Sequence, residues 1–253
     1  MKNSILTARA LCRSFACDGV QNHVLSSIDL DLYEKDFTVV MGSSGSGKST
    51  LLYCLSGMDR ATSGSVVYNG EDIAKWSETR LCSLRSGEFG FVFQQSQLVS
   101  NLSLLENVAV PGYISPGAKA REINARALEL LRYMGLENVM KQLPSQVSGG
   151  EAQRAAIARA LISKPKLLFA DEPTGALNRA NTDAVLDLLT GLNTQGQSIL
   201  MVTHEIRAAL RATRLLYLED GKIAGEMELA PYTRGEARAR EAQVSAWLTS
   251  MSW

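Results

Sequence analysis

The chain has 253 residues, of which 45% are hydrophobic, and 26 basic and 26 acidic residues leave it with no formal net charge. This length can bury a large core, either as one domain or as a domain with a subdomain. The balanced charge offers no basic field for nucleic acid and no acidic tail, so we expect no nucleic-acid partner. Apolar runs such as 198–202 are far shorter than the roughly 20 residues that a membrane-spanning helix needs.

The start of the chain and its cysteines are typical of a cytosolic protein. Residues 1–4 lead directly into a strand-like segment without an apolar signal region, which predicts a cytosolic address. The cysteines lack the spacing of metal ligands, so we expect reduced structural thiols. They are Cys12, Cys17, Cys54 and Cys82.

The first elements in chain order are two strands. Residues 5–15 are predicted to form a strand and residues 16–22 a turn. Residues 24–33 alternate apolar and polar side chains, which is typical of an antiparallel strand with one face exposed to solvent. The role of Phe15 can be interpreted in two ways. Its ring either packs in the core or stacks on a nucleotide base, and such base–aromatic stacking is worth about 1–3 kcal/mol.

A glycine-rich segment, G-S-S-G-S-G-K-S-T, then follows a buried strand at 37–41 and precedes a helix at 51–55. This context predicts a phosphate-binding loop, because glycines let the backbone wrap closely around a phosphate at a helix N-terminus. Lys48 is expected to reach the β- and γ-phosphates, and the Ser49 hydroxyl to join the shell of Mg²⁺. The loop consists of Gly42, Ser43, Ser44, Gly45, Ser46, Gly47, Lys48, Ser49 and Thr50.

After a turn at 59–64, a short strand at 65–68 ends in Asn69-Gly70, a strong hairpin signal. Residues 81–85 look helical, and residues 87–93 look like a strand that delivers Gln94 at its end. An amide in that position is a candidate contact to the metal ion or to the attacking water.

A helical insert is predicted next. Residues 103–110 form an apolar segment that Pro111-Gly112 should end, and residues 118–134 have the spacing of an amphipathic helix. The sequence Ser148, Gly149, Gly150, Glu151 then opens a long alanine-rich helix. Serine and glycines at a helix N-terminus form either a second anion cradle or only a cap.

The strand at 166–170 ends in two carboxylates. Asp171 is placed to hold Mg²⁺ through water, and Glu172 to act as general base or to position the water that attacks the γ-phosphate. A turn at 173–178, a helix at 181–192 and a strand at 197–202 follow. That strand delivers His204, for which we favour contact with the γ-phosphate over a packing role.

From about residue 4 to residue 229 the chain resembles the nucleotide-binding subunit of an ATP-binding-cassette (ABC) transporter. The resemblance rests on the order and spacing of six motifs. They are Walker A at 42–50, the Q-loop Gln94, the signature 148–151, Walker B at 167–171, the catalytic Glu172 and the switch His204.

The resemblance implies an α/β fold of the P-loop NTPase class, with an antiparallel β subdomain and a helical subdomain at about 96–160. It also implies hydrolysis of ATP with Mg²⁺ by a head-to-tail dimer, in which the signature of one subunit completes the ATP site on the other's phosphate loop. The implied partner is an integral membrane permease, which places the chain on the cytoplasmic face of the inner membrane.

Segments 91–108 and 170–178 are similar to the branch that serves lipoprotein release, macrolide export and bacitracin-type peptide resistance. Permeases of that branch have few membrane helices and a large extracytoplasmic region. Two alternatives stay open: a mechanical or signalling ATPase coupled to a permease-like protein without transport, and a soluble cassette acting on DNA or the ribosome. The absence of a second cassette and of a basic patch disfavours the soluble cassette.

The chain departs from the family pattern at a few positions, none of which removes a catalytic group. Asn178 stands where many cassettes have aspartate, Val147 and Ala152 flank the signature in place of commoner residues, and Phe15 replaces the usual tyrosine. Residues 230–253 lie outside the resemblance. Apolar side chains at helical spacing predict an amphipathic helix there, which docks on its own domain, on the twin subunit or on a membrane surface.

Overall fold

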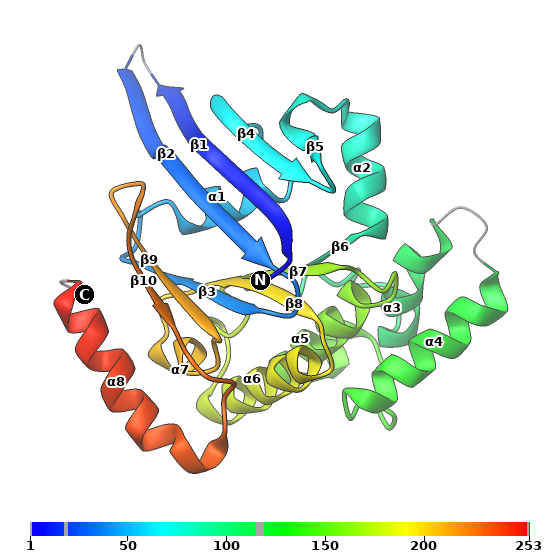
Figure 1. Cartoon of the computed structure of the whole chain (residues 1–253). Coiled ribbons are helices and arrows are strands. Elements are labelled where there is room, and N and C mark those ends of the chain that lie inside the picture. Colours follow the sequence, from blue (N-terminus) through cyan, green and yellow to red (C-terminus); the bar gives the residue numbers. More distant parts are fainter. Residues whose placement is uncertain (1, 18–19, 115–118, 252) are drawn as a thin grey trace. The chain divides into compact units, whose positions relative to one another are not determined.

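The computed structural model describes residues 2–17, 20–114, 119–251 and 253. The chain forms two compact units. Unit 1 combines Met1–Leu81 with Leu192–Trp253, and unit 2 is the segment between them, Cys82–Gly191. Both units contain strands and helices, which confirms the predicted α/β class (Figure 1).

Unit 1 holds most of the strands. They are β1 (Ser4–Cys17), β2 (Val20–Tyr33), β3 (Phe37–Met41), β4 (Ser63–Tyr68), β5 (Glu71–Asp72), β8 (Ser198–Val202), β9 (Arg214–Glu219) and β10 (Lys222–Glu228). Its helices are α1 (Lys48–Leu55), α7 (Ile206–Ala209) and α8 (Ala237–Ser250), with short 3-10 turns at Ile73–Lys75 and Arg234–Glu236. Helices α2 (Glu78–Gly87) and α6 (Arg179–Thr194) cross the boundaries between the units.

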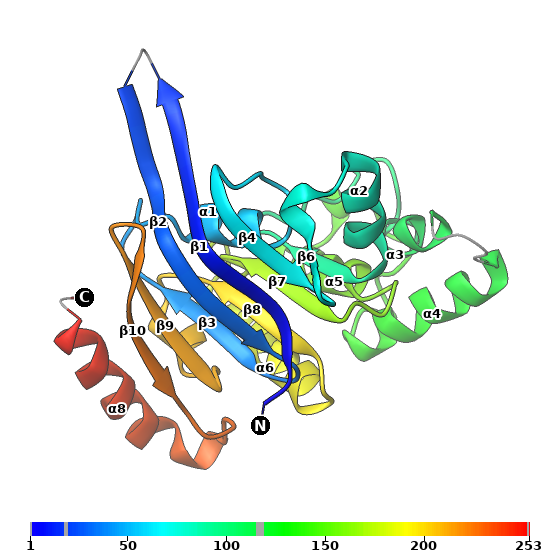
Figure 2. The ribbon, with the colours of Figure 1, turned by 45° about the horizontal axis from the view of Figure 1, so that its top comes forward.

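The strands of unit 1 pair in two groups. β1 lies between β2 and β4 in an antiparallel sheet that β5 extends, and Figure 2 shows β1 and β2 as a long twisted pair. β3 lies between β8 and β9 and is parallel to both, while β10 is antiparallel to β9. Every residue of β3 and β8 is buried, as expected for central parallel strands. Helix α1 contacts strands of both groups.

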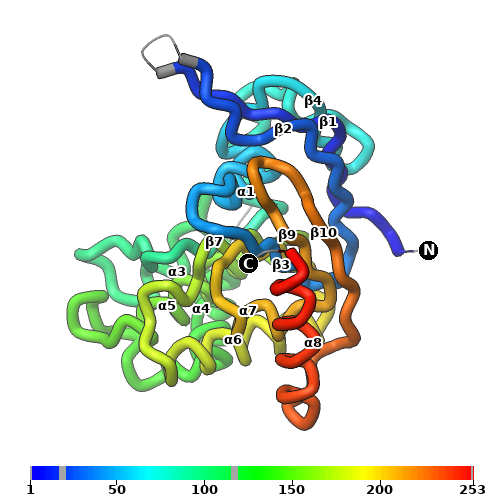
Figure 3. The backbone as a smooth tube through the Cα atoms, turned by 90° about the vertical axis from the view of Figure 1, so that its left-hand side faces the viewer, coloured from blue at the N-terminus to red at the C-terminus, as the bar shows by residue number. Residues whose placement is uncertain are grey.

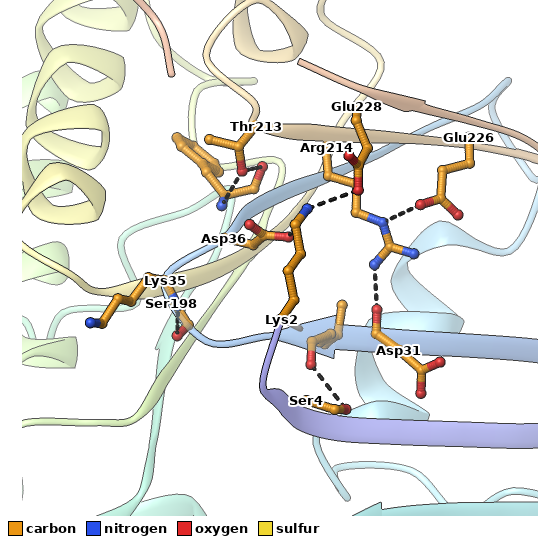
Figure 4. A network of polar contacts seen from close by, with 12 residues as sticks. Lys2, Ser4, Asp31, Lys35, Asp36, Ser198, Thr213, Arg214, Glu226 and Glu228 are labelled. Atoms are coloured by element: carbon orange, nitrogen blue, oxygen red, sulfur yellow. Dashed lines mark hydrogen bonds and ion pairs between the residues drawn. The ribbon is translucent and has the colours of Figure 1, made fainter. Parts of the chain in front are cut away.

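A polar network ties the edge of the antiparallel sheet to β9 and β10 (Figure 4). The buried Arg214 guanidinium donates to Glu226 Oε1 at 2.5 Å and to the Asp31 carbonyl of β2. Nearby, the Lys2 ammonium lies 2.8 Å from Glu228 Oε1 and 3.5 Å from Asp36 Oδ2. A buried guanidinium needs such partners, because an unpaired charge in the interior is strongly destabilising.

The hairpin of β9 and β10 was not predicted from the sequence, although its turn carries a signal. Asp220 and Gly221 both have positive φ, 46° and 71°, as a two-residue hairpin turn of the primed type requires. A Cβ on Gly221 would lie 2.4 Å from the Val24 carbonyl oxygen. An Asp-Gly pair between apolar runs could have identified both strands.

Helix α8 packs on unit 1 (Figure 3). Its Val244 and Leu248 side chains are fully buried, and Trp247 approaches Gly225 of β10. Arg240 donates to the Ala230 carbonyl at 2.7 Å and also to the Ala212 carbonyl. The helix therefore docks on its own subunit, the first of the three surfaces considered for it.

Unit 2 consists of a strand pair and helices. Its elements are β6 (Phe89–Val92), β7 (Leu167–Asp171), α3 (Leu104–Tyr113), α4 (Ala120–Tyr133), α5 (Gly149–Ala160) and a 3-10 turn at Pro144–Gln146. β6 and β7 are parallel, and α3, α4 and α5 contact one another. The Phe169 ring lies 5.1 Å from the Phe89 ring and 5.5 Å from the Phe91 ring, so aromatic packing joins the two strands.

Two predicted boundaries were wrong. The turn at 16–22 is shorter than expected, because β1 continues to Cys17 and β2 starts at Val20; residues 18–19 lie outside the described part. Pro111 does not end its helix. It lies in the last turn of α3, where its missing N–H removes one bond, and a Cβ on Gly112 would lie 2.8 Å from Ile123 of α4. Gly112 thus allows the two helices to approach closely.

In the described ranges, no helix combines the length and the apolar character that crossing a bilayer requires.

Candidate functional site

The phosphate loop connects β3 to α1 in unit 1. Gly47 has φ of 102°, a left-handed conformation that side chains other than glycine rarely adopt. A Cβ on Gly42 would lie 2.2 Å from the Leu218 carbonyl oxygen of β9. The loop can therefore follow this path only with glycine at these positions. Of the predicted loop residues, Lys48, Ser49 and Thr50 form the first turn of α1, and the others precede it.

The polar groups of the loop fit a bound phosphate. Lys48 is 7% exposed and donates to the carbonyls of Gly42 and Ser43 at 2.9 and 2.8 Å, so its ammonium lies along the loop. Ser46 Oγ is buried and has no hydrogen-bond partner among the described residues. A buried hydroxyl without a partner is costly. A phosphate oxygen in the loop would satisfy it.

The register of β3 and β8 brings His204 to the same sheet edge as the loop. Val40 pairs with Val202 in these parallel strands, and Gly42 and His204 each follow two residues later. The Thr203 amide donates to the Val40 carbonyl at 3.1 Å, and the Thr203 hydroxyl accepts from the Glu205 amide at 3.0 Å. The exposed imidazole thus follows a fixed strand end, the place where ligands bind to open α/β sheets.

Phe15 lies near the end of β1 and is 41% exposed, which excludes the core interpretation. The Arg13 guanidinium lies over its ring at 4.2 Å from the centroid. Arg13 Nε also donates to Asp59 Oδ2 at 2.9 Å, just beyond the end of α1. The Arg13 guanidinium is thus held by two interactions, one with the Phe15 ring and one with the Asp59 carboxylate. Stacking of Phe15 on a base stays a prediction.

Unit 2 contains Gln94, Asp171 and Glu172, which were predicted to contact the metal ion or the attacking water. Val92 of β6 pairs with Ala170 of β7; Gln94 follows two residues after the first, and Asp171 and Glu172 follow directly after the second. The Asp171 residue is 8% exposed. Gln94, Asp171 and Glu172 therefore all lie at the carboxyl ends of two neighbouring parallel strands.

The backbone of Glu172 is strained. Its φ of 47° is unusual for a residue other than glycine, and such conformations cluster at functional sites. The Glu172 carbonyl accepts from the Gly175 amide at 3.0 Å. A Cβ on Gly175 would lie 2.9 Å from Gln94 Nε2, so the segment after Glu172 passes close to the glutamine side chain.

The signature forms the N-terminus of α5. Ser148 is the N-cap, and Gly149, Gly150 and Glu151 form the first turn. Ser148 Oγ and the Ser148 amide donate to Glu151 Oε2 at 2.7 and 2.8 Å, while the Glu151 amide donates back to Ser148 Oγ at 3.3 Å. These bonds from Ser148 lower the pKa of the Glu151 carboxyl. The predicted cap is confirmed, and the helix N-terminus favours an anion.

The residues predicted for the metal suit Mg²⁺. Ser49 supplies a hydroxyl, Gln94 an amide oxygen and Asp171 a largely buried carboxylate, all of them hard oxygen donors. Magnesium keeps several waters and phosphate oxygens, so a few protein ligands are enough.

One polar residue of unit 2 that the sequence did not single out contacts the backbone beside Gln94 and Glu172. Gln153 of α5 is buried and donates to the carbonyls of Phe93 and Pro173. These are the neighbours of Gln94 and Glu172. A glutamine five residues after the helix cap gave no signal, because the two carbonyls it joins are distant in the sequence.

Comparison with known proteins gave consistent matches. A sequence model of the ABC transporter family matches residues 25–175. The ATP-binding cassette MJ0796, solved as a dimer in a post-hydrolysis state with ADP and Pi, is 35% identical, with a TM-score of 0.82 over 90% of this chain and 100% of that chain.

Two further structures match over similar lengths. A dimeric structure of MJ0796, described as a bacterial ABC transporter cassette, has 35% identity and a TM-score of 0.83, covering 90% of this chain and 100% of that one. The cbiO1 protein of Clostridium perfringens, part of the ABC transporter complex cbiONQ, has 26% identity and a TM-score of 0.79, covering 90% and 89%.

Proposed function

This chain belongs to the ABC transporter family, and from that premise we propose that it works as a head-to-tail pair of cassettes that powers a membrane permease. It has the fold of an ABC ATPase and is itself an ATPase. The proposal extends this activity to a dimer, a permease and a class of cargo.

The dimer proposal rests on two features of the chain that suit an anion, one in each unit. In the phosphate loop of unit 1, a phosphate would provide a hydrogen-bond partner for the buried Ser46 hydroxyl. In unit 2, Ser148 caps the N-terminus of α5, and helix N-termini favour anions. In a head-to-tail pair, the Ser148 hydroxyl of one subunit, which in the single chain donates to Glu151, would donate instead to the γ-phosphate held by the loop of the other. The dimeric MJ0796 structures support the pairing of two cassettes.

Each site residue then has a defined role. Lys48 binds the β- and γ-phosphates, and Phe15 stacks on the adenine. Glu172 takes the proton of the attacking water as general base, and His204 contacts the γ-phosphate. Ser49, Gln94 and Asp171 would hold Mg²⁺, which when bound neutralises charge on the β- and γ-phosphates.

We further propose a location and a cargo class. The chain would bind peripherally to the cytoplasmic face of the membrane through a permease with a large extracytoplasmic domain. The supporting observations are the assembly of cbiO1 in a transporter complex and the branch-like segments 91–108 and 170–178. Export or extraction of peptides, lipoproteins or antibiotics follows from that branch.

The proposal is tested by purifying the chain from membranes in detergent, with mass spectrometry of the proteins that accompany it and ATPase assays on the product. The Glu172→Gln variant is purified in parallel with ATP, because ATP that is bound between two subunits and not hydrolysed should keep them together. We expect one permease with few spans and a large extracytoplasmic domain.

Adding candidate peptides, lipoproteins or antibiotics should then raise the ATPase rate of the complex. A complex with the permease whose rate responds to none of them would contradict the cargo proposal and favour a mechanical or signalling role. Recovery with ribosomes or DNA instead of a membrane protein would contradict the transport proposal and leave the ATPase activity intact.

A further inference from the structure

Gln153 joins three parts of the site in unit 2. Its amide nitrogen donates to the Phe93 carbonyl at 2.7 Å and to the Pro173 carbonyl at 2.8 Å, and the residue is 2% exposed. Because both partners are carbonyl oxygens, the amide nitrogen must face them, and both of its hydrogens are used. The side chain itself belongs to α5, the helix that Ser148 caps.

The two carbonyls lie immediately beside the proposed reactive groups. Phe93 precedes Gln94, and Pro173 follows Glu172. A displacement of either peptide unit would therefore move a side chain that acts on the metal ion or on the attacking water. Displacements on the order of 1 Å at such groups can reduce rates about 100-fold.

The backbone of Glu172 makes this support important. A residue other than glycine stays at a φ of 47° only when the surrounding structure holds it there. Two of the bonds that hold this segment are known: the Gly175 amide donates to the Glu172 carbonyl at 3.0 Å, and Gln153 donates to the next carbonyl, that of Pro173. Loss of the second bond would weaken the support that keeps Glu172 in this conformation.

We propose that Gln153 is a positioning residue of the ATPase reaction, which aligns Gln94 and Glu172 and couples both to the signature helix. A shift of α5 when Ser148 meets a phosphate would be transmitted through Gln153 to the two carbonyls. This proposal rests on the roles proposed above for Gln94, Glu172 and Ser148. It does not require the permease.

The test replaces Gln153 with methionine, which has a similar length but no donor. We expect ATP affinity within about twofold of the original and a kcat lower by about tenfold or more, the rate equivalent of one to two lost hydrogen bonds. Isothermal calorimetry with ATP gives the affinity, and phosphate release by the full chain at saturating MgATP gives kcat.

Asn107 provides a matched control. It is also 2% exposed in unit 2, and the two hydrogens of its amide nitrogen are shared among the carbonyls of Val99, Leu102 and Ser103, while its Oδ1 accepts from the Val99 amide. These backbone groups adjoin neither Gln94 nor Glu172. The Asn107→Leu variant should lose at least as much thermal stability as Gln153→Met and still keep its kcat within about twofold. Equal kcat losses in the two variants, or an unchanged kcat in Gln153→Met, would overturn the proposal.

A second measurement separates positioning from general loosening. In a Glu172→Gln background the base is already gone, so adding Gln153→Met should lower the residual turnover by much less than it does in the original chain. A full independent loss in the double variant would show that Gln153 does not act through Glu172. Both assays use the isolated chain, so failure to recover a permease would leave them unaffected.

Discussion

The two serine caps of unit 2 allow the role of the signature to be measured against an internal standard. Ser148 caps α5 and Ser103 caps α3, each in a reciprocal box with a glutamate three residues later. Their geometries agree closely: the serine hydroxyl donates to the glutamate at 2.7 Å in one and 2.6 Å in the other, and both return bonds are 3.3 Å. Replacing either serine with alanine should therefore destabilise the fold equally.

The expected cost of each alanine is about 1 kcal/mol, which lowers the melting temperature by about 2–4 °C in a chain of this size. Ser148→Ala should lose more in function. A hydrogen bond to a charged phosphate is worth about 1.5–3 kcal/mol, so ATPase activity should fall by roughly 10- to 150-fold. Ser103→Ala should stay within about twofold.

The assays are thermal unfolding and phosphate release at saturating MgATP, followed by sedimentation of each variant with ATP in a Glu172→Gln background. Ser148→Ala should sediment as a monomer under conditions where Ser103→Ala forms a dimer. If both alanine variants lose the same activity, Ser148 acts only as a helix cap. The proposal that Ser148 contacts the phosphate on the other subunit is then refuted.

The pH dependence of the caps provides a further check. Hydrogen bonds from Ser148 and Ser103 lower the pKa of Glu151 and Glu106 in the folded chain. A lowered folded pKa stabilises the protein above the unfolded value of about 4.3, and this contribution is lost as the pH falls through the folded pKa. The stability cost of each alanine should thus shrink between pH 7 and pH 3.

Four other outcomes follow from the structure. Glu172→Gln should bind ATP normally and lose most turnover; near-normal turnover would exclude Glu172 as the base. Phe15→Ala should weaken ATP binding by about 1–3 kcal/mol in calorimetry and leave binding of inorganic triphosphate unchanged. Leu248→Ala should lower the free energy of unfolding in urea by about 3 kcal/mol, because the side chain is fully buried; a loss below 1 kcal/mol would mean that α8 is not docked. Burial raises the pKa of the Cys54 thiol to about 12, so iodoacetamide at pH 8 should label the exposed Cys82 and spare Cys54.

The sequence predicted the parts of the site that depend on local order. A strand, a glycine-rich loop and a helix follow one another directly, so the path of residues 42–50 could be inferred from the residue pattern alone. The sequence also correctly predicted that Gln94, Asp171 and His204 lie at strand ends, because each follows a strand that is recognisable from its local residue pattern.

Features that depend on contacts between distant segments were not predictable. The Gln153 bonds join carbonyls at residues 93 and 173, and the Arg13 stack on Phe15 depends on the route of β1 past residue 59. The helix through Pro111 was missed because local propensity cannot show that Gly112 lets α3 pack against α4. The docking of α8 likewise depended on a surface formed by β10.

The division of unit 1 into two chain segments affects how the protein is made on the ribosome. β3 leaves the ribosome early, but both strands that flank it, β8 and β9, begin only at Ser198 and Arg214. At typical synthesis rates β3 waits on the order of 10 s for its neighbours. During that time its largely apolar side chains and unpaired backbone are exposed, and long-range parallel pairing is slow. Newly made chains should therefore depend on chaperones until the last third of the sequence has emerged.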